Sequence, residues 1–564
     1  MQAPELAPRR AAALGVRRAT ARAVSITTSL VARRTWALGG LVILHWALVG
    51  GFALTVQHNG WAYYQGGDQI WLMSTGWLLG DGVLAPTYIG YGWALVLAPI
   101  SWITGAGYLA AMPLVAAFNV LLLAPAAILA LYGLAARVAG PVFGLVAAAV
   151  WVVTPVAVIP LWRDDYHDRY VEQFLPQALG LSALADYPSL VLLLVSAYLF
   201  VRVLETRAPL DAVASGLVAG FALGVKPSNA IFLAAPVLAA LAARRLRPLL
   251  PFALALLPAA LTLAIWKQRG LGALPLFALE EARVAAGVAL SAPMAITLPN
   301  VDRYLNVDLD VLRDNFAHLR EYFWSVRVLQ WLPIAGVVGL ARRSPSVAAL
   351  VGGWFGLYLF LKGANTLSTV AAGSFFRMLL PALPAYLLLT AGIVLLVPTL
   401  GARVATRWSP PPLRPVSHPV VVTLAVALAV VPAAAAALAR PMAQPDAIRV
   451  NGILTPVHTG ISVEVGREGV ARVVRWAHGD IGRGSVFYRV YRTAAGGADL
   501  SCAEGAPVVD CQLEMLLLGT TREQTWRDGS PPAGAEYRIG IGTNWLDDAE
   551  GGDVFLISPP APAG

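Results

Sequence analysis

The chain has 564 residues, of which 58% are hydrophobic and only 13% are charged, and its mean hydropathy is +0.66. Soluble globular proteins carry about 25% charged residues, so this composition excludes a soluble enzyme and indicates a membrane protein. The formal net charge of +9 does not indicate nucleic-acid binding, because the arginines lie in short gaps between apolar runs and form no single basic surface.

The first 35 residues form a basic, Ala-rich leader without a sustained apolar face. A segment of this kind is typical of a cytoplasmic tail that lies near the anionic inner leaflet. We assign no chemistry to it.

Apolar runs of about 20 residues, the length that a helix needs to cross the hydrocarbon core, recur along residues 36–440. We expect about 11 transmembrane helices, at 36–56, 107–135, 140–160, 181–203, 211–226, 228–243, 248–266, 327–341, 346–362, 376–398 and 418–439. The fold class is therefore a polytopic α-helical membrane protein.

Basic residues fall in alternate gaps between these spans. They are Arg137, Arg202 with Arg207, Arg244 with Arg245 and Arg247, Arg342 with Arg343, and Arg403 with Arg407 and Arg414. Because Lys and Arg accumulate on the cytoplasmic side, we expect a multi-pass protein of the plasma membrane with its N-terminus inside. The gaps at 57–106, 161–180 and 267–326, and everything after 440, then face outward.

The first outward gap contains an isolated acid, Asp68, in "YYQGGDQIWLMSTGWLLGDG". The pattern predicts a juxtamembrane helix from Asp68 to about Leu79 and a turn at 80–82. Apolar residues along this helix would lie on the membrane interface and hold the carboxylate at its surface. An acid at this place can also be merely solvated, so both interpretations stay open.

The second outward gap reads "LWRDDYHDRYVEQF" and is dense in charge. Asp164 or Asp165 with His167 could bind a divalent cation, since carboxylates suit Mg²⁺ and carboxylates with imidazole suit Mn²⁺. The alternative is a solvated loop with internal ion pairs. A third gap, at 267–326, mixes acids with bases, and we expect a partly helical lid over an outward cleft.

Two basic residues stand at the outward ends of spans, where basic residues are scarce. Lys226 precedes Pro227 between two apolar runs, and Arg377 opens the span at 376–398. An ammonium or a guanidinium at this level can bind the phosphate of a lipid-linked donor. Anchoring to ordinary headgroups is the alternative for both residues.

From about residue 453 the sequence changes to short segments such as "VARVVRW" and "SVFYRVYR", separated by the turn signals "AAGGAD" and "DGSPPAG". We expect a small extracytoplasmic all-β domain over 441–564. Cys502 and Cys511 lie in it, and they form either a disulfide that closes a hairpin or a free pair. The order "FYRVYRT", "TWRDGSPPAGAEYRIGIGTNW" and "VFLISPP" resembles a fibronectin type III sandwich, which implies binding or packing rather than catalysis.

An outward acid after the first span, the helix that follows, the "GDG" turn and the "GYGWALVLAP" approach to the next span resemble the GT-C glycosyltransferases. This superfamily includes the protein O-mannosyltransferases, the lipid A aminoarabinose transferases and the actinobacterial cell-wall transferases. "GLVAGFALGVKPSNAIFLAAP" resembles the family's Lys-Pro junction between two spans, and "SFFRMLLPALPAYLLLTAG" resembles its late span that opens with Arg. The resemblance covers residues 36–440 and implies a GT-C-like catalytic domain.

The family's catalytic acid corresponds to Asp68, although the family often has two adjacent acids here and this chain has one. The resemblance implies a transferase that takes its sugar from a polyprenyl-phosphate donor and inverts the anomeric centre. Asp68 would deprotonate the hydroxyl of a glycan, lipid or protein acceptor. Lys226 and Arg377 would hold the phosphate, and Asp164 and Asp165 would supply a second acid, an acceptor contact or a cation site.

Two other classes of function are open to a chain of this kind. A flippase or transporter of lipid-linked sugars requires charged or broken spans near the midplane and an internal repeat; we find no repeat, and the charges lie at span ends. A membrane-anchored scaffold would bind its partners through the β domain, but it has no need of eleven spans.

Overall fold

The computed structural model describes residues 34–55, 67–86, 89–271, 307–322, 326–371, 373–398, 400–401, 414–442, 446–482, 486–503, 510–543 and 553–563. Nearly all of the predicted leader and most of the predicted lid at 267–326 lie outside these residues. Of the lid region, the structure describes helix α16 (Leu309–Tyr322), which is amphipathic and packs against the bundle.

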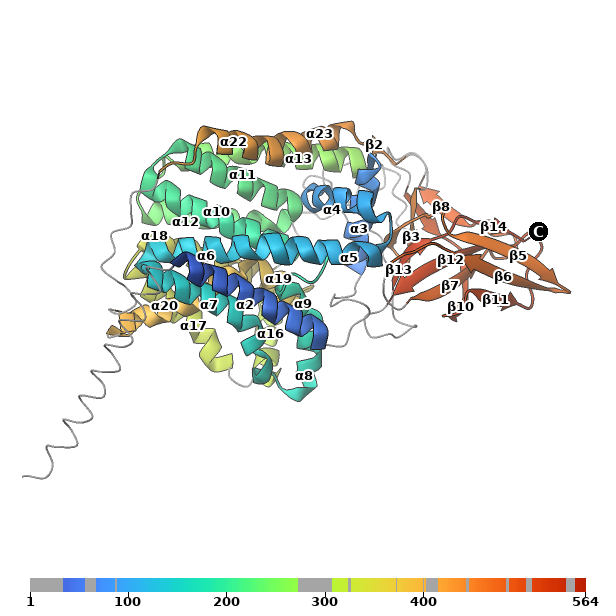
Figure 1. Ribbon diagram of the computed structural model, residues 1–564, viewed down its shortest axis with the longest axis horizontal. Coiled ribbons are helices and arrows are strands. Elements are labelled where there is room, and N and C mark those ends of the chain that lie inside the picture. The colour runs from blue at the N-terminus through green and yellow to red at the C-terminus, as the bar shows by residue number, and fades with distance from the viewer. Residues whose placement is uncertain are drawn as a thin grey trace, which may run out of the picture.

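The described apolar helices pack side by side in one bundle, and the strands gather at one end of it (Figure 1). The longer elements of the bundle are α2 (Arg34–Thr55), α5 (Tyr108–Ala117) continuing through η1 (Phe118–Leu123) into α6 (Ala124–Ala139), α7 (Pro141–Ala157), α10 (Asp186–Thr206), α11 (Pro209–Val225), α12 (Ala234–Ala242), α13 (Leu249–Leu271), α17 (Val326–Ala341), α18 (Pro345–Gly363), α19 (Ser374–Leu379) with α20 (Leu383–Gly392), and α22 (His418–Ala425) with α23 (Val431–Leu438).

Helices occupy all of the predicted spans, but they differ in length. Seven described helices are long and apolar enough to cross a membrane, and these are Arg34–Leu54, Tyr108–Ala139, Asp186–Thr206, Leu249–Gly270, Pro345–Gly363, Ser374–Leu396 and His418–Leu438. The other four predicted spans coincide with the shorter apolar helices Pro141–Ala157, Pro209–Val225, Pro227–Ala242 and Trp331–Ala341. Helices of up to 17 residues reach about 26 Å, short of a 30 Å core, so the count of 11 stays a prediction.

Helix α10 packs against several helices of the bundle and runs between its two ends. An acid, Asp186, lies at one end of α10, and arginines lie at the other. The helix begins at Asp186 and ends beside Arg202, so about 30 Å separates these ends at 1.5 Å per residue. Around its last turn, Arg137 pairs with Glu205 at 3.0 Å and Arg202 pairs with Asp211 at 3.5 Å. The basic gaps described by the structure therefore gather at the end of the bundle opposite Asp186. The assignment of this end to the cytoplasm stays a prediction.

Two short helices that pack in parallel lie beside the bundle. Helix α3 (Gly67–Gly80) and the turn that follows it confirm the helix and turn predicted after Asp68, and α4 (Tyr91–Thr104) packs against α3. Glycines permit the close contact: a Cβ on Gly76 would lie 2.5 Å from the Leu97 side chain. The Trp102 indole N–H donates to the Gly80 carbonyl at 2.9 Å and joins the C-terminal ends of the two helices.

The described residues from 446 onward form three sheets. The first has the order β11 (Thr525–Asp528), β6 (Ala471–Ala477), β5 (Ser462–Glu468); the second runs β10 (Leu516–Thr521), β7 (Phe487–Arg492), β12 (Glu536–Thr543), β13 (Asp553–Ile557), with β14 (Ala561–Pro562) also on β12. The third runs β4 (Ile453–Pro456), β3 (Ala447–Val450), β9 (Asp510–Leu513), β8 (Leu500–Ala503). Cys502 and Cys511 are joined in a disulfide between β8 and β9.

The strands pack directly onto the α3 to α5 region of the bundle (Figure 1). Strand β1 (Val83–Leu84), just after α3, pairs in parallel with β2 (Arg440–Pro441), just after the last helix. One apolar cluster includes Trp93 and Tyr108 of the helices together with Tyr537 and Phe555 of the strands. Because this core is continuous, the β domain is fixed against the helices that carry Asp68.

Substitution of Gly90 by Ala should loosen the seam between α4 and α11. A Cβ at this position would lie 2.0 Å from the Gly224 carbonyl oxygen, so one helix must move, and overpacking of this kind costs about 1–3 kcal/mol. We expect a lower midpoint of thermal unfolding in detergent. Gly39→Ala is the matched control, since no atom lies within 4 Å of its Cβ; equal midpoints for the two variants would contradict the tight seam.

Candidate functional site

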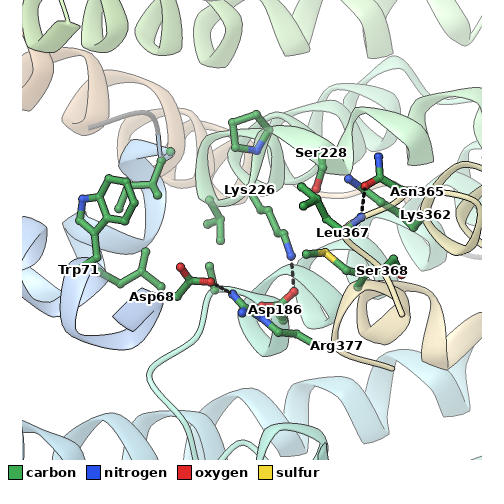
Figure 2. Close-up of a pocket in the computed structure, with 17 residues that line it drawn as sticks. Asp68, Trp71, Asp186, Lys226, Ser228, Lys362, Asn365, Leu367, Ser368 and Arg377 are labelled. Carbon is green, nitrogen blue, oxygen red and sulfur yellow. Dashed lines mark hydrogen bonds and ion pairs between the residues drawn. The ribbon is translucent and has the colours of Figure 1, made fainter. Parts of the chain in front are cut away.

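A cavity of about 240 Å³ opens where the N-terminal end of α3 meets the ends of α10, α11, α18 and α19 (Figure 2). Its charged and polar lining residues are Asp68, Asp186, Lys226, Ser228, Lys362, Asn365, Ser368 and Arg377. Its apolar lining includes Trp71, Leu72, Ile89, Val225, Leu367 and Met378. Three of the residues selected from sequence, Asp68, Lys226 and Arg377, are thus brought together from positions up to 309 residues apart.

Asp68 lies in the first turn of α3, and its side chain is 49% exposed. The adjacent Gln69 is buried, and its side-chain oxygen accepts a hydrogen bond from the Ala183 N–H at 2.9 Å. The Trp93 indole N–H donates to the Ala183 carbonyl at 2.7 Å. Both backbone groups of Ala183 are therefore held by the parallel pair α3 and α4, which fixes Asp68 relative to the start of α10.

Asp186 was not selected from sequence, yet it is the centre of the charge network. Its side chain is 2% exposed, and one carboxylate oxygen accepts from the Lys226 ammonium. Its other oxygen lies 3.5 Å from Nε of Arg377, whose terminal nitrogen donates to Asp68. Figure 2 shows the resulting chain of alternating charges, Asp68, Arg377, Asp186 and Lys226. A buried carboxylate between two cations is compensated on both sides.

Local sequence explains how Lys226 reaches this network. The residue before a proline is driven out of the helical region, and Lys226, with φ −143° and ψ 108°, ends α11 before Pro227. The extended backbone turns the lysine toward the start of α10 (Figure 2). The Lys-Pro pair thus acts as a helix break that presents a cation.

Polar groups at the far side of the cavity were also missed. Lys362 ends α18 and is 8% exposed, and Asn365, Ser368 and Ser228 lie beside it (Figure 2). Lys362 follows an apolar run in "LYLFLKGANTLS", which is the signal that selected Lys226. The same criterion could have found it.

The acids of the second outward gap lie elsewhere. Asp164 and Asp165 are exposed on the short helix α8 (Asp164–Arg169), and Asp165 pairs with Arg163 at 3.7 Å. These two acids and His167 are not among the residues that line the cavity. Within the described residues, no group of three or more His, Cys, Asp or Glu side chains is placed to hold a metal ion.

Comparison with solved structures finds the archaeal oligosaccharyltransferase AglB from Archaeoglobus fulgidus. Its apo form and its complex with an inhibitory peptide and a dolichol-phosphate each align with a TM-score of 0.35 and 14% identity over 72% of this chain. Its complex with Zn and sulfate aligns with a TM-score of 0.33 and 14% identity, again over 72% of this chain. The chain covers only 53–56% of the length of that protein. A likeness at this level assigns neither family nor activity.

No protein-family model matches the chain, and no curated protein matches it.

The Asp186 and Lys226 pair should show energetic coupling. Asp186→Asn takes this carboxylate from the Lys226 ammonium, and Lys226→Met leaves Asp186 with Arg377 alone, so the double variant should lose less stability than the sum of the single variants. We expect a coupling of about 0.5–3 kcal/mol in the free energy of unfolding in mixed micelles.

Asp81→Asn combined with Lys226→Met is the matched control, because Asp81 is exposed in the turn after α3. Strict additivity in the Asp186 cycle would contradict the network.

Proposed function

We propose that this protein is an inverting membrane glycosyltransferase of the GT-C type, which transfers a sugar from a polyprenyl-phosphate donor to a hydroxyl group. The observation that carries the proposal is one cavity that combines a half-exposed carboxylate, Asp68, with three cationic side chains at the ends of apolar helices. A base beside cations is what sugar transfer with a departing phosphate requires.

The cations provide the donor's phosphate site. Lys226, Lys362 and Arg377 line the cavity, against the two carboxylates Asp68 and Asp186. The Ser228 and Ser368 hydroxyls beside Lys362 can donate hydrogen bonds to phosphate oxygens. The apolar lining residues of the same cavity suit the first isoprene units of the lipid.

The reaction follows from the position of Asp68. Its carboxylate takes the proton of the acceptor hydroxyl while the acceptor oxygen attacks the anomeric carbon and the bond from that carbon to the phosphate oxygen breaks. The phosphate leaves with the electron pair, and Arg377 and the lysines stabilise the charge. The entering phosphate competes with Asp68 for Arg377, so donor binding frees the base while Arg377 keeps its contact with Asp186.

The cavity opens at the end of α10 remote from the basic gaps, which by the distribution of arginines is the extracytoplasmic side. Nucleotide sugars are held in the cytoplasm, so a lipid-linked donor fits this side. The acceptor is a glycan, a lipid or a protein. We locate the enzyme in the plasma membrane with its β domain outside.

We further infer that the β domain is a fibronectin type III-like sandwich. Its support is the strand order β5, β6, β11 in one sheet and β10, β7, β12, β13 in the other, the pattern of two facing antiparallel sheets in such sandwiches. Tyr537, the second residue of β12, donates to the Asp528 carboxylate at 2.8 Å across the "DGSPPAG" turn. Strands β8 and β9 are an insertion between β7 and β10.

Asp68→Asn should abolish transfer, because an amide cannot accept the acceptor's proton. General-base loss lowers kcat by about 10²–10⁴-fold. Membranes carrying the wild type or the variant are incubated with radiolabelled polyprenyl-phosphate sugars, and product is quantified. Asp81→Asn, which removes an exposed carboxylate in the turn after the other end of α3, should keep wild-type activity.

Full activity of Asp68→Asn would contradict the role of Asp68 as the general base. Transport of the labelled carrier across the membrane without product in the wild type would favour the flippase instead.

The divalent cation, Mg²⁺ or Mn²⁺, that the sequence predicts at Asp164, Asp165 and His167 stays a separate proposal, because the structure does not group these three side chains as a metal site. If these residues hold a cation needed for transfer, EDTA stops the wild type and Mn²⁺ restores it, and Asp165→Asn raises the Mn²⁺ concentration needed for half-maximal rescue by about tenfold. Transfer that is insensitive to EDTA contradicts the proposal and leaves charge stabilisation to Arg377 and the lysines.

A further inference from the structure

A buried arginine of the β domain contacts the wall of the cavity from behind. Arg449 lies on β3, and it is 3% exposed. One terminal nitrogen donates to the Pro86 carbonyl at 2.9 Å, and the other donates to the Gly452 carbonyl at 3.3 Å. A guanidinium buried this deeply is retained only where its hydrogen bonds are satisfied.

The same guanidinium lies over an aromatic ring of α3. Its central carbon is 5.6 Å from the centre of the Trp71 ring, within cation–π range. Trp71 follows Asp68 by three residues, so the two side chains lie on one face of α3, and both line the cavity (Figure 2). Arg449 therefore joins three elements: strand β3, the segment after β1, and the helix that carries the proposed base.

The segment after β1 is held from a second side by the helical bundle. Lys267 of α13 is 4% exposed and donates to the Ile89 carbonyl at 2.6 Å. Ile89 and Gly90 line the cavity. The carbonyls of Pro86 and Ile89 are thus bound by one side chain from the β domain and one from the bundle.

An acid at the edge of the β domain, Asp553, lies near enough to Asp68 for the two carboxylates to interact. Burial raises the pKa of Asp553, at the start of β13; the Arg489 guanidinium opposes this rise, and the Asp68 carboxylate adds to it. Strand β13 packs against α3. Two independent contacts, at β3 and at β13, therefore bring the β domain to the rim of the site.

We propose that Arg449 is a positioning residue of the transferase site, which makes the β domain a structural part of the catalytic cavity and not an appended binding module. The predicted effect of Arg449 on kcat rests on the proposed function. Its predicted effect on the position of α3 does not depend on that function. By holding Trp71 and Pro86, Arg449 sets the place of α3 and hence the distance between Asp68 and the cations of the opposite wall.

Substitutions of Arg449 should have graded effects, according to how many of its contacts each one removes. Arg449→Ala removes two hydrogen bonds and the cation over Trp71. Arg449→Lys keeps a cation near the ring but loses the planar fork that reaches two carbonyls, so it should restore part of the effect. Arg527→Ala is the matched control on the same domain, because the Arg527 side chain is 70% exposed and lies 3.7 Å from Glu468.

The test reports position without requiring activity. The two natural cysteines are paired in the disulfide, so Asp68→Cys supplies a single thiol, whose alkylation rate by a membrane-impermeant maleimide is measured in each background. We expect Arg449→Ala to change this rate by about fivefold or more, Arg449→Lys to change it less, and Arg527→Ala to leave it unchanged. Equal rates in all four backgrounds would overturn the proposal.

The second part of the test measures the kinetics of sugar transfer in proteins that retain Asp68. Misplacement of a catalytic group by about 1 Å lowers rates by about 10²-fold, so Arg449→Ala should lower kcat while the KM for the donor stays close to wild type. Unchanged kcat in a folded Arg449→Ala protein would also overturn the claim.

The two proposals fail in different ways. A wild type that transfers no sugar from any polyprenyl-phosphate donor, together with an altered alkylation rate, supports the positioning role and contradicts the proposed function. If Arg449→Ala does not fold, the graded comparison between Arg449→Lys and Arg527→Ala decides: a shifted alkylation rate in the lysine variant alone supports the proposal, and identical rates overturn it.

Discussion

The buried carboxylate of Asp186 is the interaction on which the site depends. It lies between the Lys226 ammonium and the Arg377 guanidinium, and Arg377 extends the chain of charges to Asp68. An ionised carboxylate in a nearly dry environment is tolerated only with such partners. Because Asp186 begins α10, Lys226 ends α11 and Arg377 belongs to α19, this one requirement brings three helix ends to a common point.

The same arrangement gives the cavity its chemistry. Asp68 is at the outer end of the charge chain and half exposed, so it can meet a hydroxyl from the aqueous side, while the cations lie deeper among apolar side chains. A phosphate that enters from the lipid side would exchange one anion for another at Arg377 without leaving a buried charge unpaired. The β domain supports the cavity from behind, since Arg449 binds the Pro86 carbonyl, and Lys267 of α13 binds the Ile89 carbonyl nearby.

Sequence patterns predict those residues of the site that are charged and lie at the outward ends of spans. Asp68, Lys226 and Arg377 were selected as charges at the same ends of spans, and they share one cavity. Asp186 was missed because an acid in the first turn of a helix is an ordinary preference, and nothing local indicates that Lys226, 40 residues later, will bind it. Asp164 and Asp165 illustrate the opposite error, in which the sequence selects residues that do not line the cavity. A dense cluster of charges in the sequence does not determine how far the cluster lies from the site. Two of the predicted spans are shorter than a membrane crossing because the Lys226-Pro227 break ends α11 where the chain turns toward the site.

The most direct measurement is a structure of the protein with a polyprenyl phosphate bound in a lipid nanodisc. The account predicts phosphate oxygens within hydrogen-bond distance of at least two of Lys226, Lys362 and Arg377, with the contact between Arg377 and Asp68 opened and the Asp68 carboxylate facing the space beside the phosphate. A phosphate bound away from this cavity, or an intact pair between Asp68 and Arg377 with the lipid in place, would contradict it.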